Sequence, residues 1–417
     1  MGYETYRIAD LIDEIAMGPF GSNIKVSCFV DSGVPVLNGS NLEGFSLSEK
    51  TFRYVTREKA DSLNKANAHR GDIVITHRGT LGQIVFIPQD SKYDRYVISQ
   101  SQFRVRCNDK VLPEYLVYYF HTPIGQHKLL SNASQVGVPA LARPSSTFQQ
   151  IEVVLPELSI QKRVVEIIST IQKKIVNNQE LNDNLRQQAQ ALFKKWFVDN
   201  PDAILWKEGT FSNLIEKTIS GDWGKDSPSG NNTEMVYCIR GADIPEVRAG
   251  NKGKMPTRYI LPKNYAAKQL VDGDIVVEIS GGSPTQSTGR AAAVSDALLA
   301  RYDKGMVCTN FCKALKPRAG YSMYVYYYWQ YLYDRDIFFS YENGTTGIKN
   351  LDINGFIETE PIVIAPEDLV EKFDAVCQTV FSKIYANGME NEQLALVRDT
   401  ILPKLMSGEI DVSAVQL

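Results

Sequence analysis

The sequence VVLPELSIQKRVVEIISTIQ at residues 153–172 opens a long helical pattern that ends in AQALFKKWFVD at 189–199. A second pattern of the same kind opens with VIAPEDLVEKFDAVCQTVF at 363–381 and ends in RDTILPKLMSGEID at 398–411. Internal repetition constrains architecture before single motifs do. The chain is therefore predicted to contain a duplicated helix, each copy following a block rich in strand and loop patterns.

The two blocks ahead of the helices begin alike, with YRIADLIDEIAMGPFGS at 6–22 and GTFSNLIEKTISGDWGK at 209–225. This similarity indicates a duplicated globular domain as well as a duplicated helix. We predict an α+β fold with a pseudo-twofold, circular repeat of two globular domains and two long helices. The predicted boundaries are 1–156 for the first domain, 157–200 for the first helix, 201–365 for the second domain, and 366–417 for the second helix and tail.

Apolar residues recur at three- and four-residue steps in both helices, from Ile160 to Trp196 and from Phe373 to Leu405. This spacing places them in one stripe along each helix. Asparagines interrupt the stripes near their middles, and polar residues in a helix seam fix its register at some cost in stability. The helices are therefore expected to pack on each other; the alternative is two unrelated helices, each packed on its own domain. The interrupting residues are Asn177, Asn178, Asn182, Asn387 and Asn391.

The composition of the 417 residues is that of a globular protein, with a formal net charge of −3. No apolar run approaches the length of a membrane span, and the first residues resemble no signal peptide, so a cytoplasmic location is expected. The six cysteines show no CxxC spacing and the four histidines are scattered. Cys308 and Cys312 are expected to be buried thiols, and no metal site is expected.

Several catalytic motifs are absent from the sequence. There is no GxxxxGK followed by Ser or Thr for holding phosphates, no Asn/Asp-Pro-Pro-aromatic box of an amino-methyltransferase, and no ExK tripeptide of a nuclease core. No Ser, His and Asp set stands out by its context. The chain is therefore predicted to bind rather than to catalyse.

With the repeat and these absences in view, the chain resembles the specificity subunit of type I restriction-modification enzymes over essentially its whole length. One departure is the second helix entry, PEDLVEKF, which lacks the glutamine of PELSIQKR, so packing at that turn is expected to differ. Besides the helix endings, the resemblance is carried by ELSIQKRVVEII at 157–168, GDIVITHRGTLG at 71–82, GDIVVEISGG at 273–282 and NGTTGIKNLD at 343–352.

The resemblance implies a non-catalytic, DNA-binding subunit with two target recognition domains, each reading one half of a bipartite, asymmetric site. It also implies that the helices pair as an antiparallel coiled coil, set the spacer between the half-sites and dock two methylation subunits, which nuclease-translocase subunits join. No cofactor is expected in this chain, because S-adenosylmethionine, ATP and Mg would be used by those partners. The alternative is an interaction scaffold of a methyltransferase complex that does not bind DNA sequence-specifically. A self-sufficient nuclease or methyltransferase is disfavoured by the missing motifs.

Base edges are read by Arg, Lys, Asn, Gln, Ser and Thr, so glycine-containing loops rich in these residues are the candidate DNA contacts. Four loops qualify, two in each domain. Their alternative interpretation is that of ordinary solvated turns. The candidates are Thr76, His77, Arg78, Thr80, Ser134, Gln135 and Arg143 in the first domain, and Ser283, Thr285, Gln286, Ser287, Arg290, Thr345, Thr346, Lys349 and Asn350 in the second.

The aromatic cluster YSMYVYYYWQYLY at 321–333 could suggest base stacking. A counterpart, PEYLVYYFHTPIGQHKL at 113–129, stands at the same place in the first copy. Both are therefore predicted to be helices packed on their domains. The tail at 407–417 stands where the first copy continues through 199–209 into the next domain, so the end of the chain is expected to lie near its beginning.

Overall fold

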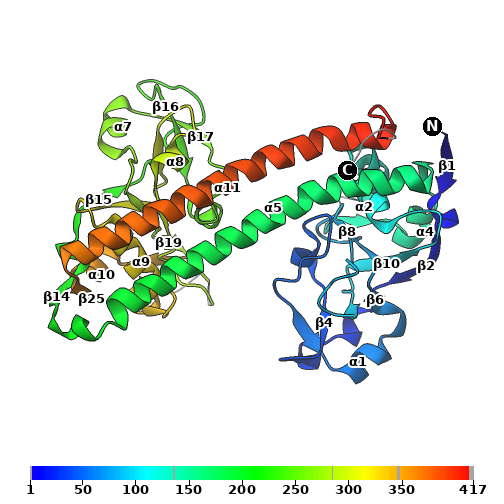
Figure 1. Cartoon of the computed structure of the whole chain (residues 1–417), viewed down its shortest axis with the longest axis horizontal. Helices are drawn as coiled ribbons and strands as arrows, with labels where there is room; N and C mark the ends of the chain where they lie inside the picture. Colours follow the sequence, from blue (N-terminus) through cyan, green and yellow to red (C-terminus); the bar gives the residue numbers. More distant parts are fainter. Residues whose placement is uncertain (1, 135–136, 284, 345–347, 413–417) are drawn as a thin grey trace. The chain divides into compact units, whose positions relative to one another are not determined.

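The computed structural model describes residues 2–134, 137–283, 285–344 and 348–412. The chain forms two compact units: a first unit of Met1–Gln172 with Ala395–Leu417, and a second unit of Lys173–Leu394. Each unit contains one globular domain and part of each of two long helices, α5 (Leu158–Phe193) and α11 (Glu367–Ser407) (Figure 1). The predicted α+β class and both predicted long helices are confirmed.

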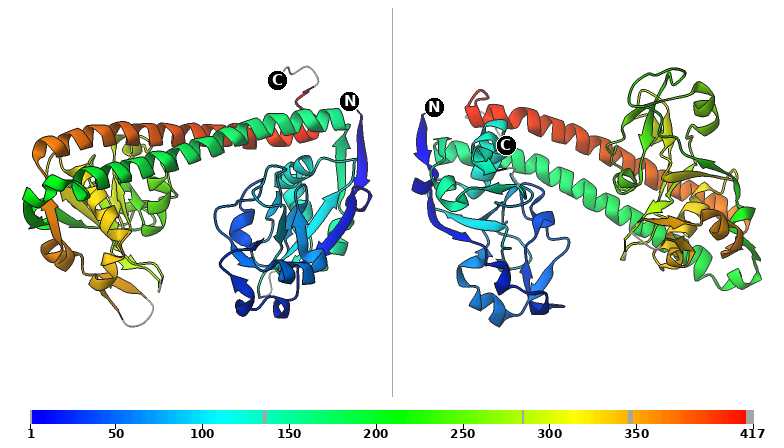
Figure 2. Two further views of the ribbon diagram at one scale, coloured as in Figure 1. Left: turned by 60° about the horizontal axis from the view of Figure 1, so that its bottom comes forward. Right: turned by 180° about the vertical axis from the view of Figure 1, so that it is seen from behind.

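The two helices pair antiparallel, as the contacts within each unit show (Figure 2). In the second unit, Asn178 donates from Nδ2 to Asn391 Oδ1 at 2.9 Å, and Asn387 donates to Asn182 Oδ1 at 2.8 Å. In the first unit, a guanidinium nitrogen of Arg398 donates to the Gln172 amide oxygen at 2.8 Å. The alternative of two unrelated helices is therefore excluded.

Four of the five asparagines that were predicted to lie in the seam between the helices are buried there. Asn178, Asn182, Asn387 and Asn391 are buried. Asn177 is exposed instead, because a neighbour one position away lies about 100° around the helix from Asn178. The prediction that Asn177 belongs to the seam was wrong.

The two helix entries differ, as the missing glutamine indicates. Gln161 is buried; its amide oxygen accepts from the Leu112 backbone N–H at 3.0 Å, and its amide nitrogen donates to the Pro156 carbonyl at 3.0 Å. At the corresponding position of the second copy, five residues after Pro366, Glu371 is exposed. The first helix is thus anchored to its domain by a buried amide that the second helix lacks.

The first unit is built on a four-stranded antiparallel sheet in the order β2-β10-β7-β8, accompanied by a five-stranded sheet in the order β3-β5-β4-β9-β6 and by the pairs β1-β13 and β11-β12. Helix α2 packs on the four-stranded sheet, and its aromatic residues lie in the main core of the unit. The strands are β1 (Tyr3–Arg7), β2 (Ile12–Met17), β3 (Phe29–Val30), β4 (Val34–Val36), β5 (Arg53–Val55), β6 (Asn67–His69), β7 (Ile73–Thr76), β8 (Ile84–Phe86), β9 (Arg95–Val97), β10 (Gln102–Cys107), β11 (Ala133–Ser134), β12 (Ala140–Leu141) and β13 (Glu152–Pro156). The short helices are α1 (Arg57–Ser62), α2 (Pro113–His121), α3 (Pro123–Leu130) and α4 (Pro144–Gln149).

The second unit repeats this plan with the four-stranded order β15-β22-β18-β20 and the pair β14-β25. Two three-stranded sheets, β17-β16-β21 and β19-β24-β23, complete it. The strands are β14 (Lys207–Thr210), β15 (Ile215–Ser220), β16 (Glu234–Ile239), β17 (Thr257–Ile260), β18 (Ile275–Glu278), β19 (Ser280–Gly281), β20 (Ala291–Ala293), β21 (Met306–Cys308), β22 (Cys312–Pro317), β23 (Glu342–Asn343), β24 (Lys349–Leu351) and β25 (Pro361–Ile364). The short helices are α6 (Ile244–Arg248), α7 (Pro262–Lys268), α8 (Asp296–Leu299), α9 (Ser322–Tyr333) and α10 (Ile353–Thr359).

The aromatic segment at 321–333 forms α9, and most of its rings lie in the core, as predicted. Trp329 and Tyr324 are fully buried, and the Trp329 indole donates to the Gly289 carbonyl at 2.7 Å. Its counterpart α2 buries Tyr115 and Phe120 in the same way. These aromatic residues stabilise their domains and are not available to a ligand.

The GDIV motif occurs in both domains and forms the same turn in each. Gly71 and Gly273 both adopt a positive φ, at 84° and 85°, where glycine is favoured. The following aspartates, Asp72 and Asp274, are buried and accept a backbone N–H three residues before them, at 3.0 and 2.9 Å. The motif therefore fixes the turn that leads into the central strand of each sheet.

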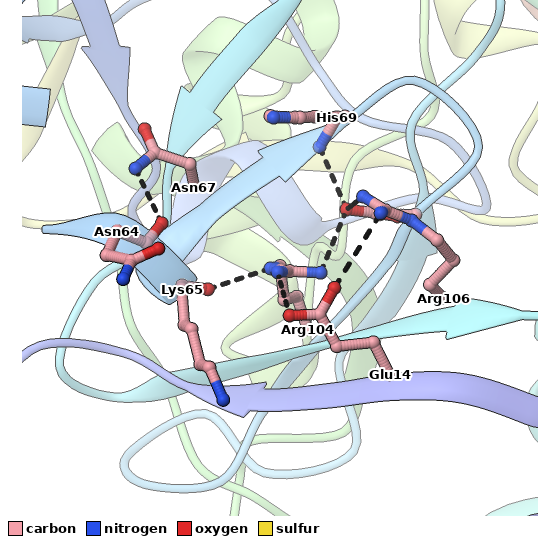
Figure 3. A network of polar contacts seen from close by, with 8 residues as sticks. Glu14, Asn64, Lys65, Asn67, His69, Arg104 and Arg106 are labelled. Atoms are coloured by element: carbon pink, nitrogen blue, oxygen red, sulfur yellow. Dashed lines mark hydrogen bonds and ion pairs between the residues drawn. The ribbon is translucent and has the colours of Figure 1, made fainter. Parts of the chain in front are cut away.

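Each of these aspartates pairs with a cation on the neighbouring strand. Arg106 donates to Asp72 at 2.9 and 3.2 Å, and Lys316 donates to Asp274 at 2.9 and 2.7 Å. In the first unit the network extends to Arg104, whose guanidinium lies between Asp72 and Glu14 (Figure 3). The hydrogen bond from Arg104 lowers the pKa of Glu14.

The last described residues lie beside the first strand, as expected from the circular repeat. A Cβ added at Gly408 would come within 2.4 Å of the Tyr3 hydroxyl, and Arg163 donates to the Val412 carbonyl at 2.8 Å. Both contacts lie within the first unit.

Candidate nucleic-acid interface

The candidate loops of the first unit meet at one edge of its four-stranded sheet. Thr76 at the end of β7 faces Gln102 at the start of β10, and β8 begins beside β7 at the same edge. The β11-β12 hairpin joins this edge, because Gly79 donates to the Pro139 carbonyl at 2.8 Å and Leu141 donates to the His77 carbonyl at 2.9 Å. The structure thus brings together two loops that lie about 60 residues apart in the sequence.

The second unit brings its two candidate loops together in the same way. Leu351 donates to the Ile279 carbonyl at 2.9 Å, and β19 pairs with β24 next to the end of β18. The Ser280 hydroxyl donates to Asn350 Oδ1 at 2.6 Å, which joins the two loops through their side chains.

The backbone hydrogen bonds at the two edges match each other pair by pair. His77 donates to the Ser101 carbonyl at 2.8 Å and accepts from Leu141, while Ile279 donates to the Phe311 carbonyl at 2.9 Å and accepts from Leu351. His77 therefore corresponds to Ile279, and the residue that follows each of them, Arg78 in the first unit and Ser280 in the second, also differs. One backbone arrangement carries different side chains in the two units.

The candidates at 76–80 divide into buried and accessible residues. Arg78 and Thr80 are exposed. Thr76 is buried and its hydroxyl donates to Gln83 Oε1 at 3.1 Å, so this side chain serves the fold. His77 is partly buried with its Nε2 at 3.1 Å from the Gln100 carbonyl, and burial lowers its pKa.

The other first-unit candidates do not all lie at this edge. Ser134, on β11, is exposed, and Gln135 lies outside the described residues. Arg143 precedes α4 with a left-handed φ of 46° and lines a separate open cavity of about 660 Å³ with His127 and Lys128. Arg143 lines this cavity, whereas Arg78 does not.

In the second unit the loop 283–290 turns through a backbone hydrogen bond from Ser283 N–H to the Gln286 carbonyl at 2.7 Å. Ser283 is partly exposed, and Thr285 and Gln286 are exposed. Ser287 is buried, and its carbonyl accepts from the Tyr333 hydroxyl at 3.1 Å.

The remaining second-unit candidates include two cations that already have acidic partners. Arg290 donates twice to Glu278, at 2.7 and 2.6 Å, and this pairing raises the Arg290 pKa. Lys349 donates to Glu342 at 2.7 Å, whereas Asn350 is exposed. Thr345 and Thr346 lie outside the described residues.

Aromatic side chains at these edges were missed by the sequence analysis. Phe20 is 83% exposed, Phe311 62% and Trp223 38%. Phe20 and Trp223 occupy matching positions in GPFGS and SGDWG, so alignment of the two repeats contains a signal for this pair. No such signal exists for Phe311, because Ser101 takes its place in the first unit.

The described residues present hydrogen-bonding loops and exposed aromatics, and no group of three His, Cys, Asp or Glu side chains among them could hold a metal ion. Cys308 and Cys312 are buried thiols whose pKa values are raised by burial. In the described part of the chain, no helix is both long and apolar enough to cross a membrane. Two α+β units with matching loop edges define a protein built from a duplicated domain.

Comparison with known proteins agrees with this class. Residues 2–187 match the family model described as the type I restriction modification DNA specificity domain. The chain is 24% identical to the type I restriction enzyme MjaIX specificity subunit of Methanocaldococcus jannaschii, over 98% of this chain and 94% of that protein. It is also 24% identical to the HindI specificity subunit of Haemophilus influenzae, over 82% and 87%. The chain is thus similar to type I restriction-modification specificity subunits, and in one of these comparisons the similarity extends over 98% of its length.

The fold agrees with a solved structure described as the type I restriction-modification system S subunit from M. genitalium. The two share 15% sequence identity and a TM-score of 0.54, with 97% of this chain and 96% of that chain covered. At this identity the likeness concerns the fold alone.

Proposed function

We propose that this chain is the DNA-recognition subunit of a type I restriction-modification complex, and that each globular domain reads one half of a bipartite, asymmetric target. The observation that carries the proposal is the matched pair of loop edges. His77 and Arg78 stand on the same backbone arrangement as Ile279 and Ser280. A shared framework with different side chains suits two readers that dock alike and recognise different bases.

The exposed residues of the loop edges are the base-reading candidates. Arg78 is the strongest of them in the first domain, since a guanidinium can donate twice to guanine in the major groove. In the second domain the exposed amides of Gln286 and Asn350 suit adenine in the same way. Thr76 and Ser287 are left out of this proposal because they are buried.

Arg290 and Lys349 are not proposed to contact bases. Each is held by a carboxylate, and leaving that carboxylate unpaired would cost free energy. They are therefore assigned to the shape of the loop rather than to direct contact with bases.

The paired helices are proposed to set the spacer between the half-sites and to dock two methylation subunits, which nuclease-translocase subunits then join. Methyl transfer from S-adenosylmethionine and ATP- and Mg-dependent cleavage would belong to those partners. The chain itself would need no cofactor, in keeping with the catalytic motifs missing from its sequence.

A domain exchange tests the assignment of one domain to each half-site. Residues 1–200 are replaced by the same region of another family member, the chimera is expressed in the host with its partner subunits, and the methylated sequences are read genome-wide. We expect one half-site to change while the other is retained. The matched control exchanges only residues 157–200 and is expected to leave both half-sites as they were.

Two outcomes would contradict the proposal. If the exchange of 1–200 altered both half-sites or neither, the assignment of one domain to each half-site would be wrong. If the complex with methylation subunits shifted no duplex in a gel assay, the chain would be an interaction scaffold without sequence-specific DNA binding.

A further inference from the structure

From the two loop edges we infer that exposed aromatic side chains, Phe20 in the first unit and Phe311 with Trp223 in the second, stack on DNA bases and unstack one base step in each half-site. This inference rests on the proposed function and adds a mode of contact to it. The hydrogen-bonding loops would recognise base edges. The aromatic rings would make binding depend on how easily two neighbouring base pairs can be unstacked.

The position of Phe20 and Trp223 is imposed by the fold of the loops that carry them. A Cβ added at Gly18 would lie 1.9 Å from the Ser99 carbonyl oxygen, and one added at Gly221 would lie 1.9 Å from that of Thr309. Both loops therefore need glycine to approach the turn that begins the neighbouring strand. The same close approach in both units presents an aromatic ring two residues later.

The Trp223 ring is held in place from one side. The Arg258 guanidinium stands over this ring at 4.0 Å, and its Nε donates to the Trp223 carbonyl at 2.8 Å. Arg258 is itself buried. A ring fixed on one face by a buried cation and open on the other is already arranged for stacking, so little conformational freedom would be lost on binding.

Trp223 and Phe311 line one open cavity of about 540 Å³ at the sheet edge. The charged groups in its wall are already paired, Arg240 with Asp243 and Glu278 with Arg290. What the cavity offers a ligand is therefore two aromatic surfaces with polar atoms at their margin. Nucleobases suit such a surface because every base has a π-face, whatever its hydrogen-bonding edge.

Nucleic acid explains the arrangement better than a protein partner does. A protein interface core is a contiguous apolar patch. In the second unit, Trp223 and Phe311 stand among Arg, Ser, Thr and Asn side chains, at the loop edge that also carries the exposed Asn350. Alternation of stacking and hydrogen-bonding side chains is typical of protein surfaces that bind nucleic acids. Apolar side chains inserted at base steps also make recognition depend on the deformability of the step.

The test uses the full chain co-purified with its methylation subunits. Duplexes carrying the cognate site are labelled with 2-aminopurine at one position at a time, leaving out the base that is methylated, because its fluorescence rises when its stacking is lost and a methyltransferase unstacks its own target base. Wild type is expected to enhance fluorescence at one step in each half-site. Phe20→Ala should abolish the enhancement in one half-site and Phe311→Ala in the other, each weakening cognate binding by about 5- to 150-fold.

Two controls keep the test specific. Val154→Ala and Ile204→Ala remove apolar side chains that are also exposed, at 41% and 88%, but that lie within β13 and ahead of β14, outside the loop edges. They are expected to bind and to enhance fluorescence like wild type. Phe20→Leu, which keeps an apolar wedge without a π-face, should recover only part of the affinity.

Three results would overturn the inference. If Phe20→Ala and Phe311→Ala bind the cognate duplex and enhance fluorescence like wild type, the rings do not touch bases, and the proposed function still stands. If these variants lose their methylation subunits instead, the rings belong to a protein interface. If wild type itself does not prefer the cognate duplex, the proposed function fails first.

Discussion

Asn182 joins three segments of the second unit and allows the role of the helix seam to be measured. Its Nδ2 donates to the Ala249 carbonyl at 3.1 Å and to the Ile384 carbonyl at 3.0 Å, and its Oδ1 accepts from Asn387 at 2.8 Å. The side chain is 2% exposed, so water cannot replace these partners. At about 1 kcal/mol net for each hydrogen bond, Asn182→Ala should lower the free energy of unfolding by about 3 kcal/mol.

Asn387→Ala removes one of the same three hydrogen bonds and should cost about 1 to 2 kcal/mol, because it leaves Asn182 Oδ1 unpaired. The double variant should therefore cost about 1 kcal/mol less than the sum of the two single variants. Replacing both asparagines by leucine should restore much of the stability while removing the polar pair that selects the antiparallel register.

The assay can be confined to the second unit, because all four tryptophans, at positions 196, 206, 223 and 329, lie between residues 173 and 394. Urea unfolding followed by tryptophan fluorescence thus reports on this unit. Asn177→Ala is the matched control, since it removes an exposed amide from the same helix and should change stability by no more than about 0.5 kcal/mol. A loss for Asn182→Ala no larger than that of Asn177→Ala would refute the reasoning.

Three further outcomes are expected in the first unit. Arg78→Ala should lose about 1 to 3 kcal/mol of discrimination at one base pair, measured by competition with singly substituted duplexes, whereas uniform weakening on all sequences would mark a phosphate contact. Asp72→Asn should cost about 3 to 5 kcal/mol in thermal unfolding followed by circular dichroism, because it removes the buried carboxylate that the buried Arg104 shares with Arg106 and leaves both cations only Glu14. Burial lowers the folded-state pKa of His121, so the unfolded chain binds the proton more readily and stability should fall as the pH drops below about 6.5. His121→Gln should reduce that fall in urea unfolding at pH 8 and 5.5, and His127→Gln, at an exposed site, should leave it unchanged.

The elements that could be predicted are those that a pattern of neighbouring residues determines. Apolar spacing along α5 and α11 is repeated over many turns, and two copies of the pattern reinforce each other. The aromatic helix α9 was recognised as framework because α2 repeats it. Asn177 shows the limit of this reasoning, since a spacing pattern cannot decide which of two adjacent asparagines faces the partner helix.

The loop edges were predictable as segments but not residue by residue. Ser287 and Arg290 have the composition of recognition residues, yet one is buried and the other is bound to Glu278. Glu278 and Arg290 lie side by side only because β18 and β20 pair, a contact that no local pattern contains. The exposure of Phe311 likewise depends on a turn between two strands of different sheets. Non-local pairing therefore decides which loop residues remain free to meet a ligand.

Equivalent positions of the two units fall into two kinds. Where the copies keep the same chemistry at equivalent positions, as in the Asp72–Arg106 and Asp274–Lys316 pairs, the residues hold the sheet. Where the backbone hydrogen bonds are kept but the side chains differ, as at Arg78 and Ser280, the backbone arrangement does not depend on one particular side chain. The proposed site of two unlike halves would need this combination, because the framework can stay nearly symmetric while each edge changes its side chains independently. Substitutions at such positions should therefore alter the sequence that is read, whereas substitutions in the aspartate pairs should alter only whether the domain folds.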